Sequence, residues 1–303
     1  MPDEISSVIV VGSLHYDIVV EAPRQPQRGE TLMGRDWFPK FGGKGGNQAV
    51  AARMTGSDVY FLGAIGSDDF GSFLLSRLQE AGVRTDEIEQ CEGRSGMSVA
   101  ISDADGDYAA VVVSGSNWAI DTDKISHAAA WKEGSVLILQ NEIPSEINMA
   151  AASAARLNGL KTVWNAAPMR PDETGLLALC DVVILNSIEA RQMSGMEVET
   201  SEQALQTAEK IASLGTATII TLGGKGLVYC EVGGTATYLP AQKVQNPKSH
   251  GAGDVFTGAF STAFAKGEHL ADACSFASEA AYRHVSGLGL NGQKKPVLKH
   301  ELM

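Results

Sequence analysis

The chain alternates short runs of apolar or β-branched residues with longer segments in which apolar positions recur at helical spacing. The uninterrupted runs occupy residues 8–11, 136–139, 162–164, 182–185 and 218–222. Runs of this kind are typical of strands buried on both faces of a parallel sheet, with helices as the crossovers. We therefore predict an α/β fold in which a mostly parallel central sheet lies between helical layers.

Two of the connecting segments carry helix boundary signals. Residues 145–157 begin with a serine that we expect to cap the helix, and they stop before Gly159. A second helix follows Thr200, which forms a predicted capping box with Gln203, and it ends near Gly215. These boundaries place a helix in each of two connections between strands, as βαβ units require.

Residues 14–40 and 95–113 depart from this pattern. Polar and apolar positions alternate over residues 97–101, and together with residues 109–113 this indicates half-buried hairpin strands. No internal repeat, low-complexity tract or linker divides the chain. We therefore predict one α/β domain over residues 1–303.

Charge and composition narrow the classes of partner. The 303 residues carry a net charge of -12 and are 44% hydrophobic, enough for a large core. Nucleic acid or an anionic membrane would require a basic face, so we expect small molecules as partners, no nucleic acid and no membrane. No apolar run approaches the roughly 20 residues of a spanning helix, and no signal peptide pattern is visible, so we expect a cytoplasmic protein.

Candidate chemistry begins at Gly251-Ala252-Gly253-Asp254, which leads directly into an apolar stretch at residues 255–260. Small residues at a helix start leave backbone N–H groups open, and the start carries about half a unit of positive charge. This arrangement suits a transferring phosphoryl group with a carboxylate beside it to accept a proton. A glycine before a helix can also be only a tight turn, and the motif alone leaves both interpretations open.

A second glycine cluster lies near the other end of the chain, at residues 41–47 (Phe-Gly-Gly-Lys-Gly-Gly-Asn). A helix-like run follows at residues 48–54 and stops at Gly56. The spacing matches neither the Walker-type phosphate loop nor the dinucleotide fingerprint. Glycines let the backbone approach a ligand closely, and the alternative is a flexible turn that caps a core helix.

Taken together, the two glycine clusters resemble the two signatures of the ribokinase-like (PfkB-type) carbohydrate kinases. The resemblance keeps the family's order along nearly the whole chain. It includes the first strand with its sugar-binding acid (residues 10–17), a Gly-x-Asp-x-x-Gly turn (63–71), a strand end with a glutamate (139–142), an Asn-x-x-Pro segment (165–168), an Asn-x-x-Glu motif (186–189) and a nucleotide-binding turn (221–226). It implies a three-layer αβα fold with a small β-sheet lid formed by about residues 14–40 and 95–113.

The resemblance also implies transfer of the γ-phosphoryl group of ATP to a primary hydroxyl of a pentose or related sugar. Asp254 becomes the general base, and Gly251, Ala252 and Gly253 surround the transferring group. Mg²⁺ is implied with ATP, organised by Glu189 through water. The implied sugar contacts are His15, Asp17, Gly42, Gly43, Asn47 and Glu142, and the implied nucleotide contacts are Lys44, Asn186, Thr221, Gly223 and Gly226.

Two positions depart from the family pattern. His15 stands where the family has an asparagine that contacts the sugar, so we expect a shifted sugar preference, with a histidine packed at the lid hinge as the alternative. Lys248 stands where the family has an aspartate that helps to hold a potassium ion. Because a lysine repels a bound cation, we expect no monovalent cation requirement. The ammonium group either replaces the ion or points into solvent.

Other functions stay open at this level. A kinase of the same family could act on a ketose, a polyol or a nucleoside, and a catalytically weak sugar- or nucleotide-responsive binding protein is the alternative from another class. The intact Asp254 argues against the binding protein. A lid of this type also implies a homodimer that pairs through the lid.

Overall fold

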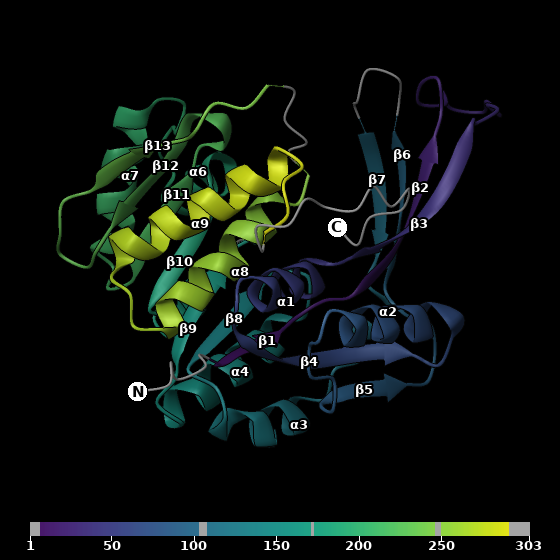
Figure 1. Ribbon diagram of the computed structural model, residues 1–303, viewed down its shortest axis with the longest axis horizontal. Helices are drawn as coiled ribbons and strands as arrows, with labels where there is room; N and C mark the ends of the chain where they lie inside the picture. Colours follow the sequence, from purple (N-terminus) through teal and green to yellow (C-terminus); the bar gives the residue numbers. More distant parts are fainter. Residues whose placement is uncertain (1–6, 103–107, 171–172, 246–249, 291–303) are drawn as a thin grey trace.

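The main feature of the computed structural model, which describes residues 7–102, 108–170, 173–245 and 250–290, is a nine-stranded sheet. The order is β13-β12-β11-β10-β9-β8-β1-β4-β5, and all pairs are parallel except for the antiparallel pairs made by β12 and β13 at one edge (Figure 1). This confirms the mostly parallel sheet that the apolar runs predict. The strands are β1 (Ser7–Val11), β4 (Asp58–Gly66), β5 (Ile88–Cys91), β8 (Val136–Gln140), β9 (Lys161–Asn165), β10 (Val182–Asn186), β11 (Ala217–Thr221), β12 (Gly226–Cys230) and β13 (Thr237–Pro240).

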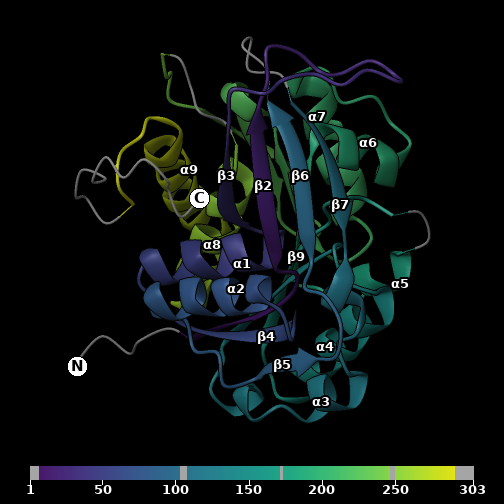
Figure 2. The same ribbon diagram turned by 90° about the vertical axis from the view of Figure 1, so that its right-hand side faces the viewer.

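A smaller sheet of four strands, in the order β3-β2-β6-β7, stands beside the main sheet (Figures 1 and 2). Its strands come from the two segments that depart from the parallel pattern in the sequence, and β6 and β7 form the expected antiparallel hairpin. The hairpin belongs to the small sheet, because β6 pairs in parallel with β2. The strands are β2 (His15–Glu21), β3 (Asp36–Gly42), β6 (Met97–Ser102) and β7 (Tyr108–Val113).

Helices cover both faces of the main sheet, and alternate residues of its strands point to opposite cores. In β1, Ile9 and Val11 pack with residues of α3, α4, α6 and α7, whereas Val8 and Val10 pack on the face of α1 and α2. Helices α8 and α9 extend this second face over β8 to β12. The helices are α1 (Lys44–Met54), α2 (Asp69–Glu80), α3 (Thr122–His127), α4 (Ser145–Leu157), α5 (Thr174–Leu177), α6 (Ser187–Ser194), α7 (Ser201–Ala212), α8 (Ala252–Ala265) and α9 (Leu270–Val285), with short 3₁₀ turns at Gly115–Trp118, Ala129–Lys132 and Gly223–Lys225.

The first glycine cluster belongs to a helix for most of its length, which corrects the expectation that the helix follows it. Helix α1 begins at Lys44, and Gly43 caps it with a φ of 87°. A Cβ atom at Gly45 would lie 2.6 Å from the backbone nitrogen of Ser13, and one at Gly46 would lie 2.6 Å from the Phe41 ring. These glycines therefore let the start of α1 pack directly on the end of β1, where no side chain fits.

The structure confirms one of the two predicted helix caps and contradicts the other. The capping box of α7 is confirmed, because Thr200 and Gln203 each bond to the other's backbone N–H group. The expected cap at Ser145 is wrong, because α4 is preceded by Pro144 as its cap residue and Ser145 lies inside the helix. Its hydroxyl donates instead to the carboxylate of Glu173, a partner 28 residues away that local sequence does not reveal.

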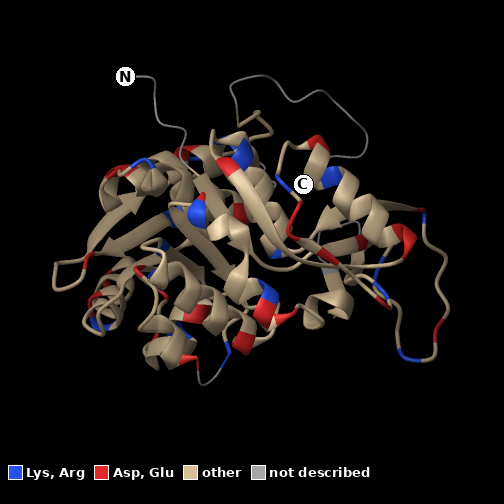
Figure 3. Cartoon of the chain, turned by 90° about the horizontal axis from the view of Figure 1, so that it is seen from below, with Lys and Arg blue, Asp and Glu red and all other residues tan. Residues whose placement is uncertain are grey.

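Charged positions are spread over the molecule. In the view of Figure 3, Lys and Arg positions lie scattered among Asp and Glu positions rather than gathered on one side. None of the helices in the described parts of the chain is long and apolar enough to cross a membrane.

Candidate active site

Asp254 lies in the first turn of α8 and is held there by two side chains of α1. The residue is only 9% exposed. Its Oδ2 accepts a hydrogen bond from Asn47 Nδ2 at 3.0 Å, and its Oδ1 accepts one from Gln48 Nε2 at 2.9 Å. Burial raises the pKa of Asp254 above its usual value, although the charge of Lys44 and the two amides oppose this rise. The site thus contains a desolvated carboxylate with both oxygens fixed in space.

The backbone in front of Asp254 has the geometry of an anion cradle. Gly251 caps α8 in the left-handed region with a φ of 78°, and no side chain caps the helix. The first N–H groups of a helix have no intrahelical acceptor and carry partial positive charge. A Cβ atom at Gly253 would meet no atom within 4 Å, so this turn is open on one side. An anion bound at this turn would accept from the N–H groups of Ala252, Gly253 and Asp254.

A cavity of about 140 Å³ lies over this turn and collects residues that are distant in the sequence. Strands β10 and β11 end at it, and the carboxyl ends of parallel strands are the usual place for ligands in open α/β sheets. Seven of the residues predicted from the sequence line it together: Lys44, Asn186, Glu189, Thr221, Gly251, Gly253 and Asp254.

Asn186 and Glu189 form a capping box at the start of α6. Asn186 Oδ1 accepts from the N–H of Glu189 at 2.9 Å, and Glu189 Oε2 accepts from the N–H of Asn186 at 2.8 Å. Burial raises the pKa of Glu189, opposed by the hydrogen bond from Asn186 and by the charge of Lys44. The two residues therefore cap a helix and line the cavity at the same time.

The residues of the cavity fit a magnesium ion that arrives with a nucleotide. Mg²⁺ keeps several waters and is bound through one or two carboxylates together with phosphate oxygens. Glu189 is a carboxylate at the cavity, and the box uses only its Oε2. In the described ranges, no group of three or more His, Cys, Asp or Glu side chains could hold a metal ion. A protein cage for a resident ion is therefore not part of these ranges.

A second polar group surrounds Asp17 on β2 of the small sheet. Ser98, its neighbour on β6, donates its hydroxyl to Asp17 Oδ1. A Cβ atom at Gly42 would lie 2.0 Å from Asp17 Oδ2, so only glycine leaves space for this carboxylate. Burial raises the pKa of Asp17, and the Ser98 hydrogen bond and the charges of His15 and Lys40 oppose it. The result is a partly desolvated acceptor of the kind that binds hydroxyl groups.

Glu142 connects this second group to α1. Its Oε2 accepts from Ser13 Oγ at 2.5 Å and from the backbone N–H of Lys44 at 2.8 Å. The latter bond satisfies one of the first N–H groups of α1, which have no partner inside the helix. Glu142 thus helps to fix the helix that carries Asn47 and Gln48. The Asp17 group and Asp254 are two ends of one polar site joined through α1.

His15 is buried in this second group, with 3% of its surface exposed. Its Nδ1 lies 3.9 Å from Glu142 Oε2, and its Nε2 has no hydrogen-bond partner within the described ranges. Tyr16 points the other way and stacks on Phe70 with ring centroids 3.9 Å apart. Side chains alternate along a strand, so His15 and Asp17 share one face of β2 while Tyr16 packs on α2 from the other.

The predicted nucleotide-binding turn after β11 has one residue at the cavity, Thr221, whereas its last glycine, Gly226, packs against β13. Thr221 lines the cavity and donates its hydroxyl to Leu185 O at 3.2 Å. Gly223 has a φ of 58°, which favours glycine. A Cβ atom at Gly226, with a φ of 120°, would lie 2.2 Å from Leu239 O, so the pairing of β12 with β13 alone explains this glycine.

Comparison with known proteins identifies the family. The family model described as pfkB family carbohydrate kinase matches residues 6–294. The chain belongs to this family of carbohydrate kinases. The ribokinase of Schizosaccharomyces pombe is 33% identical, covering 91% of this chain and 90% of its own, and that of Lactococcus lactis is 30% identical, covering 95% and 93%. The structure of Arabidopsis thaliana ribokinase complexed with ribose and ATP superposes with a TM-score of 0.86 at 29% identity, covering 96% of each chain.

Sequence reasoning missed several residues of this kinase site. Gln48 bonds the carboxylate of Asp254, and its signal is a polar residue before four apolar ones in a helix. Ser98 bonds Asp17 and interrupts the apolar positions of a strand. Asn165 Nδ2 donates to Thr257 Oγ1 at 3.0 Å, and this hydroxyl donates to Gly253 O at 2.9 Å, which ties β9 to the cradle. Asn165 begins the Asn-x-x-Pro segment noted in the sequence, but no local signal points to Thr257 as its partner.

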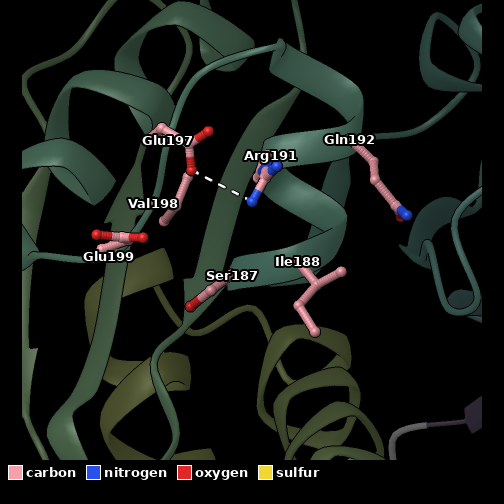
Figure 4. Close-up of a pocket in the computed structure, with 7 residues that line it drawn as sticks. All are labelled: Ser187, Ile188, Arg191, Gln192, Glu197, Val198 and Glu199. Carbon is pink, nitrogen blue, oxygen red and sulfur yellow. Dashed lines mark ion pairs between the residues drawn. The ribbon is translucent and has the colours of Figure 1, made fainter.

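A cavity of about 430 Å³ along α6 is larger, yet none of the predicted site residues lines it (Figure 4). Arg191 and Glu197 form an ion pair across it at 3.3 Å, and both side chains are more than half exposed. Exposed ion pairs of this kind contribute little to the stability of the folded state. Cavity size alone therefore does not select the candidate active site, which rests on the buried carboxylate of Asp254 and the open start of α8. Lys248, the position expected to replace the family's cation ligand, lies outside the described residues.

Proposed function

We propose that this family member transfers the γ-phosphoryl group of ATP to a primary hydroxyl of a pentose or closely related sugar. The observation that carries the proposal is Asp254, a buried carboxylate in the first turn of α8, beside open backbone N–H groups. Relatives named ribokinase, and a similar structure complexed with ribose and ATP, support a pentose as the acceptor. We also propose that residues 1–303 act as one domain with the small sheet as its lid.

In this mechanism Asp254 accepts the proton of the sugar hydroxyl as that oxygen attacks. A hydroxyl is a weak nucleophile until its proton is accepted, and a carboxylate within hydrogen-bond reach supplies this. The N–H groups of Ala252 and Gly253 stabilise charge on the transferring group, the larger effect in phosphoryl transfer. The cradle and the base lie in one helical turn, so a single ligand position can meet both.

The sugar is held at the other end of the site. Asp17, with Gly42 and Gly43 beside it, accepts hydrogen bonds from neighbouring hydroxyls. The Oδ1 of Asn47 is buried without a partner in the described ranges, so it remains available to accept another. Oε2 of Glu142 is already bonded to Ser13 and Lys44, so its Oε1 is the oxygen that accepts a hydrogen bond from the sugar.

The nucleotide occupies the cavity side of the cradle. Lys44 places a positive charge at the cavity, where Asn186 and Thr221 contribute polar groups. Gly223 allows the tight turn beside the nucleotide. Glu189 would hold Mg²⁺ that arrives with ATP through ordered water, and the ion would neutralise part of the phosphate charge.

A coupled assay of ADP formation across a panel of sugars, polyols and nucleosides tests this function. We expect saturable turnover with a pentose or a related sugar and little with nucleosides. Turnover only with a nucleoside or a ketose would replace the sugar assignment by another substrate of the same family. Binding of sugar and ATP without turnover on any member of the panel would contradict the kinase assignment.

His15→Asn is expected to increase kcat/KM for ribose relative to the best substrate of the panel by about tenfold. The imidazole beside Asp17 is bulkier than asparagine, and its unpartnered Nε2 lacks the donor and acceptor pair of an amide. His127→Asn on α3 is the matched control, because this histidine is exposed and bonds only Asp123 O in the described contacts. An unchanged substrate ranking would favour the packing role of His15.

Activity is expected to be nearly the same in sodium, potassium or a large organic cation at equal ionic strength. In the sequence pattern, Lys248 stands at the position of the family's aspartate that helps to hold a potassium ion. Desolvation, together with the charges of Lys40 and Lys44, lowers the pKa of His250 to about 4, so this imidazole is neutral at the pH of the assay. Strong potassium activation would contradict this. In Lys248→Asp, a loss that potassium restores indicates an internal substitute for the ion, whereas little effect indicates a solvated side chain.

We further propose a cytoplasmic homodimer that pairs through the small sheet. Its strands β3 and β7 expose Trp37 (61%), Val111 (70%), Val112 (54%) and Val113 (52%). The three valines are consecutive on β7, an edge strand of this sheet, and exposed apolar side chains on an edge strand favour pairing with another chain. Sedimentation equilibrium checks the proposal, and a monomer at all accessible concentrations would contradict it.

A further inference from the structure

The two oxygens of Asp254 are bonded in different surroundings. Oδ1 accepts from Gln48 Nε2 in the buried space between α1 and α8, where Gln48 is 0% exposed. Oδ2 accepts from Asn47 Nδ2 in a partly buried position. An ionised carboxylate only accepts hydrogen bonds, so the amide nitrogens must face it. Gln48 fixes the inner oxygen, and the outer oxygen is the one that a ligand can reach.

Close packing of the two helices brings Gln48 to the carboxylate. Gly258 follows Asp254 by one turn of α8, and a Cβ atom there would lie 2.6 Å from Gln48 O and 2.7 Å from the Cβ of Ala51. Only glycine allows α1 and α8 to approach this closely at the level of the site. The contact between Gln48 and Asp254 is therefore built into the helix packing.

The side-chain carbonyl oxygen of Gln48 indicates that this residue does more than stabilise the fold. Its Oε1 is buried and has no hydrogen-bond partner in the described ranges. A buried acceptor without a partner destabilises the folded state. An apolar side chain of the same length would fill the space without this cost, but it could not donate to Asp254.

We propose that Gln48 is a positioning residue for phosphoryl transfer, holding Oδ1 of Asp254 so that Oδ2 accepts the proton of the sugar hydroxyl. The inference rests on the proposed role of Asp254 as the general base. Gln48 does not touch the substrate in this arrangement, and its whole effect passes through the carboxylate.

The same hydrogen bond favours the ionised form of the base. Burial raises the pKa of Asp254, the charge of Lys44 and the bonds from Gln48 and Asn47 lower it, and the charge of Glu142 raises it. Lys44 at the start of α1 and Glu142 after β8 are the charged groups that act on it. Loss of the Gln48 donor removes a charge-assisted bond and moves the pKa further up. A base must be ionised to act, so activity then begins at higher pH.

The test is the pH profile of kcat/KM for the sugar in Gln48→Met, which keeps the length of the side chain and removes the donor. We expect the acidic limb to move up by about 1 to 2 pH units, as the loss of one hydrogen bond to a charge predicts. The plateau should fall about 10- to 100-fold through kcat, because the freed carboxylate is misplaced, while the sugar KM changes little. Loss of folded structure alone would lower activity by the same factor at every pH.

Gln48→Glu keeps the shape of the side chain and tests the inference if the first variant folds poorly. Two carboxyl groups at this distance share one proton and titrate as a pair, so the acidic limb should not stay where the parent protein has it. Gln140→Met is the matched control, since Gln140 is also 0% exposed and both of its amide atoms lack partners in the described ranges. The acidic limb of the pH profile of Gln140→Met should stay where the parent protein has it.

Asp254→Asn, measured in parallel, separates the two proposals. If it is inactive and neither Gln48 variant moves the acidic limb, the positioning role is wrong and the general base stands. A uniform loss across pH in both Gln48 variants also contradicts the positioning role. If Asp254→Asn keeps most of its activity, the general-base assignment itself fails, whatever the Gln48 variants do.

Discussion

Asp254→Asn is expected to lower kcat by about 10³-fold or more while sugar and ATP still bind, because general base catalysis contributes about 10²- to 10⁴-fold and the replacement keeps the shape of the side chain. Steady-state turnover and calorimetric binding of both ligands check this. Asp272→Asn in the first turn of α9 is the matched control, since this aspartate is exposed and its helix follows α8. A purified Asp254→Asn protein with most of its activity would contradict the assignment.

The same variant should not lose stability. A carboxyl group whose pKa is raised in the folded state holds its proton more tightly there than in the unfolded chain. Its contribution to stability is present below the unfolded pKa and is lost as pH rises through the folded pKa. At neutral pH the ionised Asp254 therefore destabilises the fold, and the neutral asparagine removes this penalty. The urea midpoint of Asp254→Asn at neutral pH should equal or exceed that of the parent, and a large drop would show that the carboxylate is structurally required.

Asp17→Asn is expected to raise the KM for the sugar by about 10- to 100-fold, as the loss of a hydrogen bond to a charged acceptor predicts, and to leave the KM for ATP almost unchanged. The carboxylate accepts from two hydroxyls at once, whereas an asparagine has one acceptor atom and turns two donors toward the same groups. Initial-rate measurements with each substrate varied in turn check this separation.

Asp36→Asn controls for changes in the small sheet, because Asp36 is the first residue of β3, is exposed and accepts only the N–H of Trp37 in the described contacts. It should leave both KM values in place. A parallel rise of both KM values in Asp17→Asn would indicate a disturbed lid instead of a lost sugar contact. An unchanged sugar KM would remove Asp17 from the sugar site.

Much of the fold follows from local sequence because its signals are short-range. The buried strands are uninterrupted runs of apolar and β-branched residues, and Ile9 and Val10 need only alternate to fill cores on two sides of β1. The cap of α7 involves Thr200 and Gln203, three residues apart. The chemistry of the cradle is local as well, since Gly251 and Asp254 lie in one helical turn. The order of the elements and the candidate base could therefore be predicted.

The tertiary structure decided which groups meet. Asp254 and Gln48 are 206 residues apart, and their bond depends on the close approach of α1 and α8 at Gly258. Glu142 accepts from the N–H of Lys44 across 98 residues, which gives the start of α1 a hydrogen-bond partner from outside the helix. No short-range pattern encodes such pairs, because the partners are chosen by the packing of whole helices and sheets. The amino-acid sequence by itself determined the layers and the candidate reactive groups, and only the packing of those layers determined which oxygen of Asp254 bonds to Gln48 and which one bonds to Asn47.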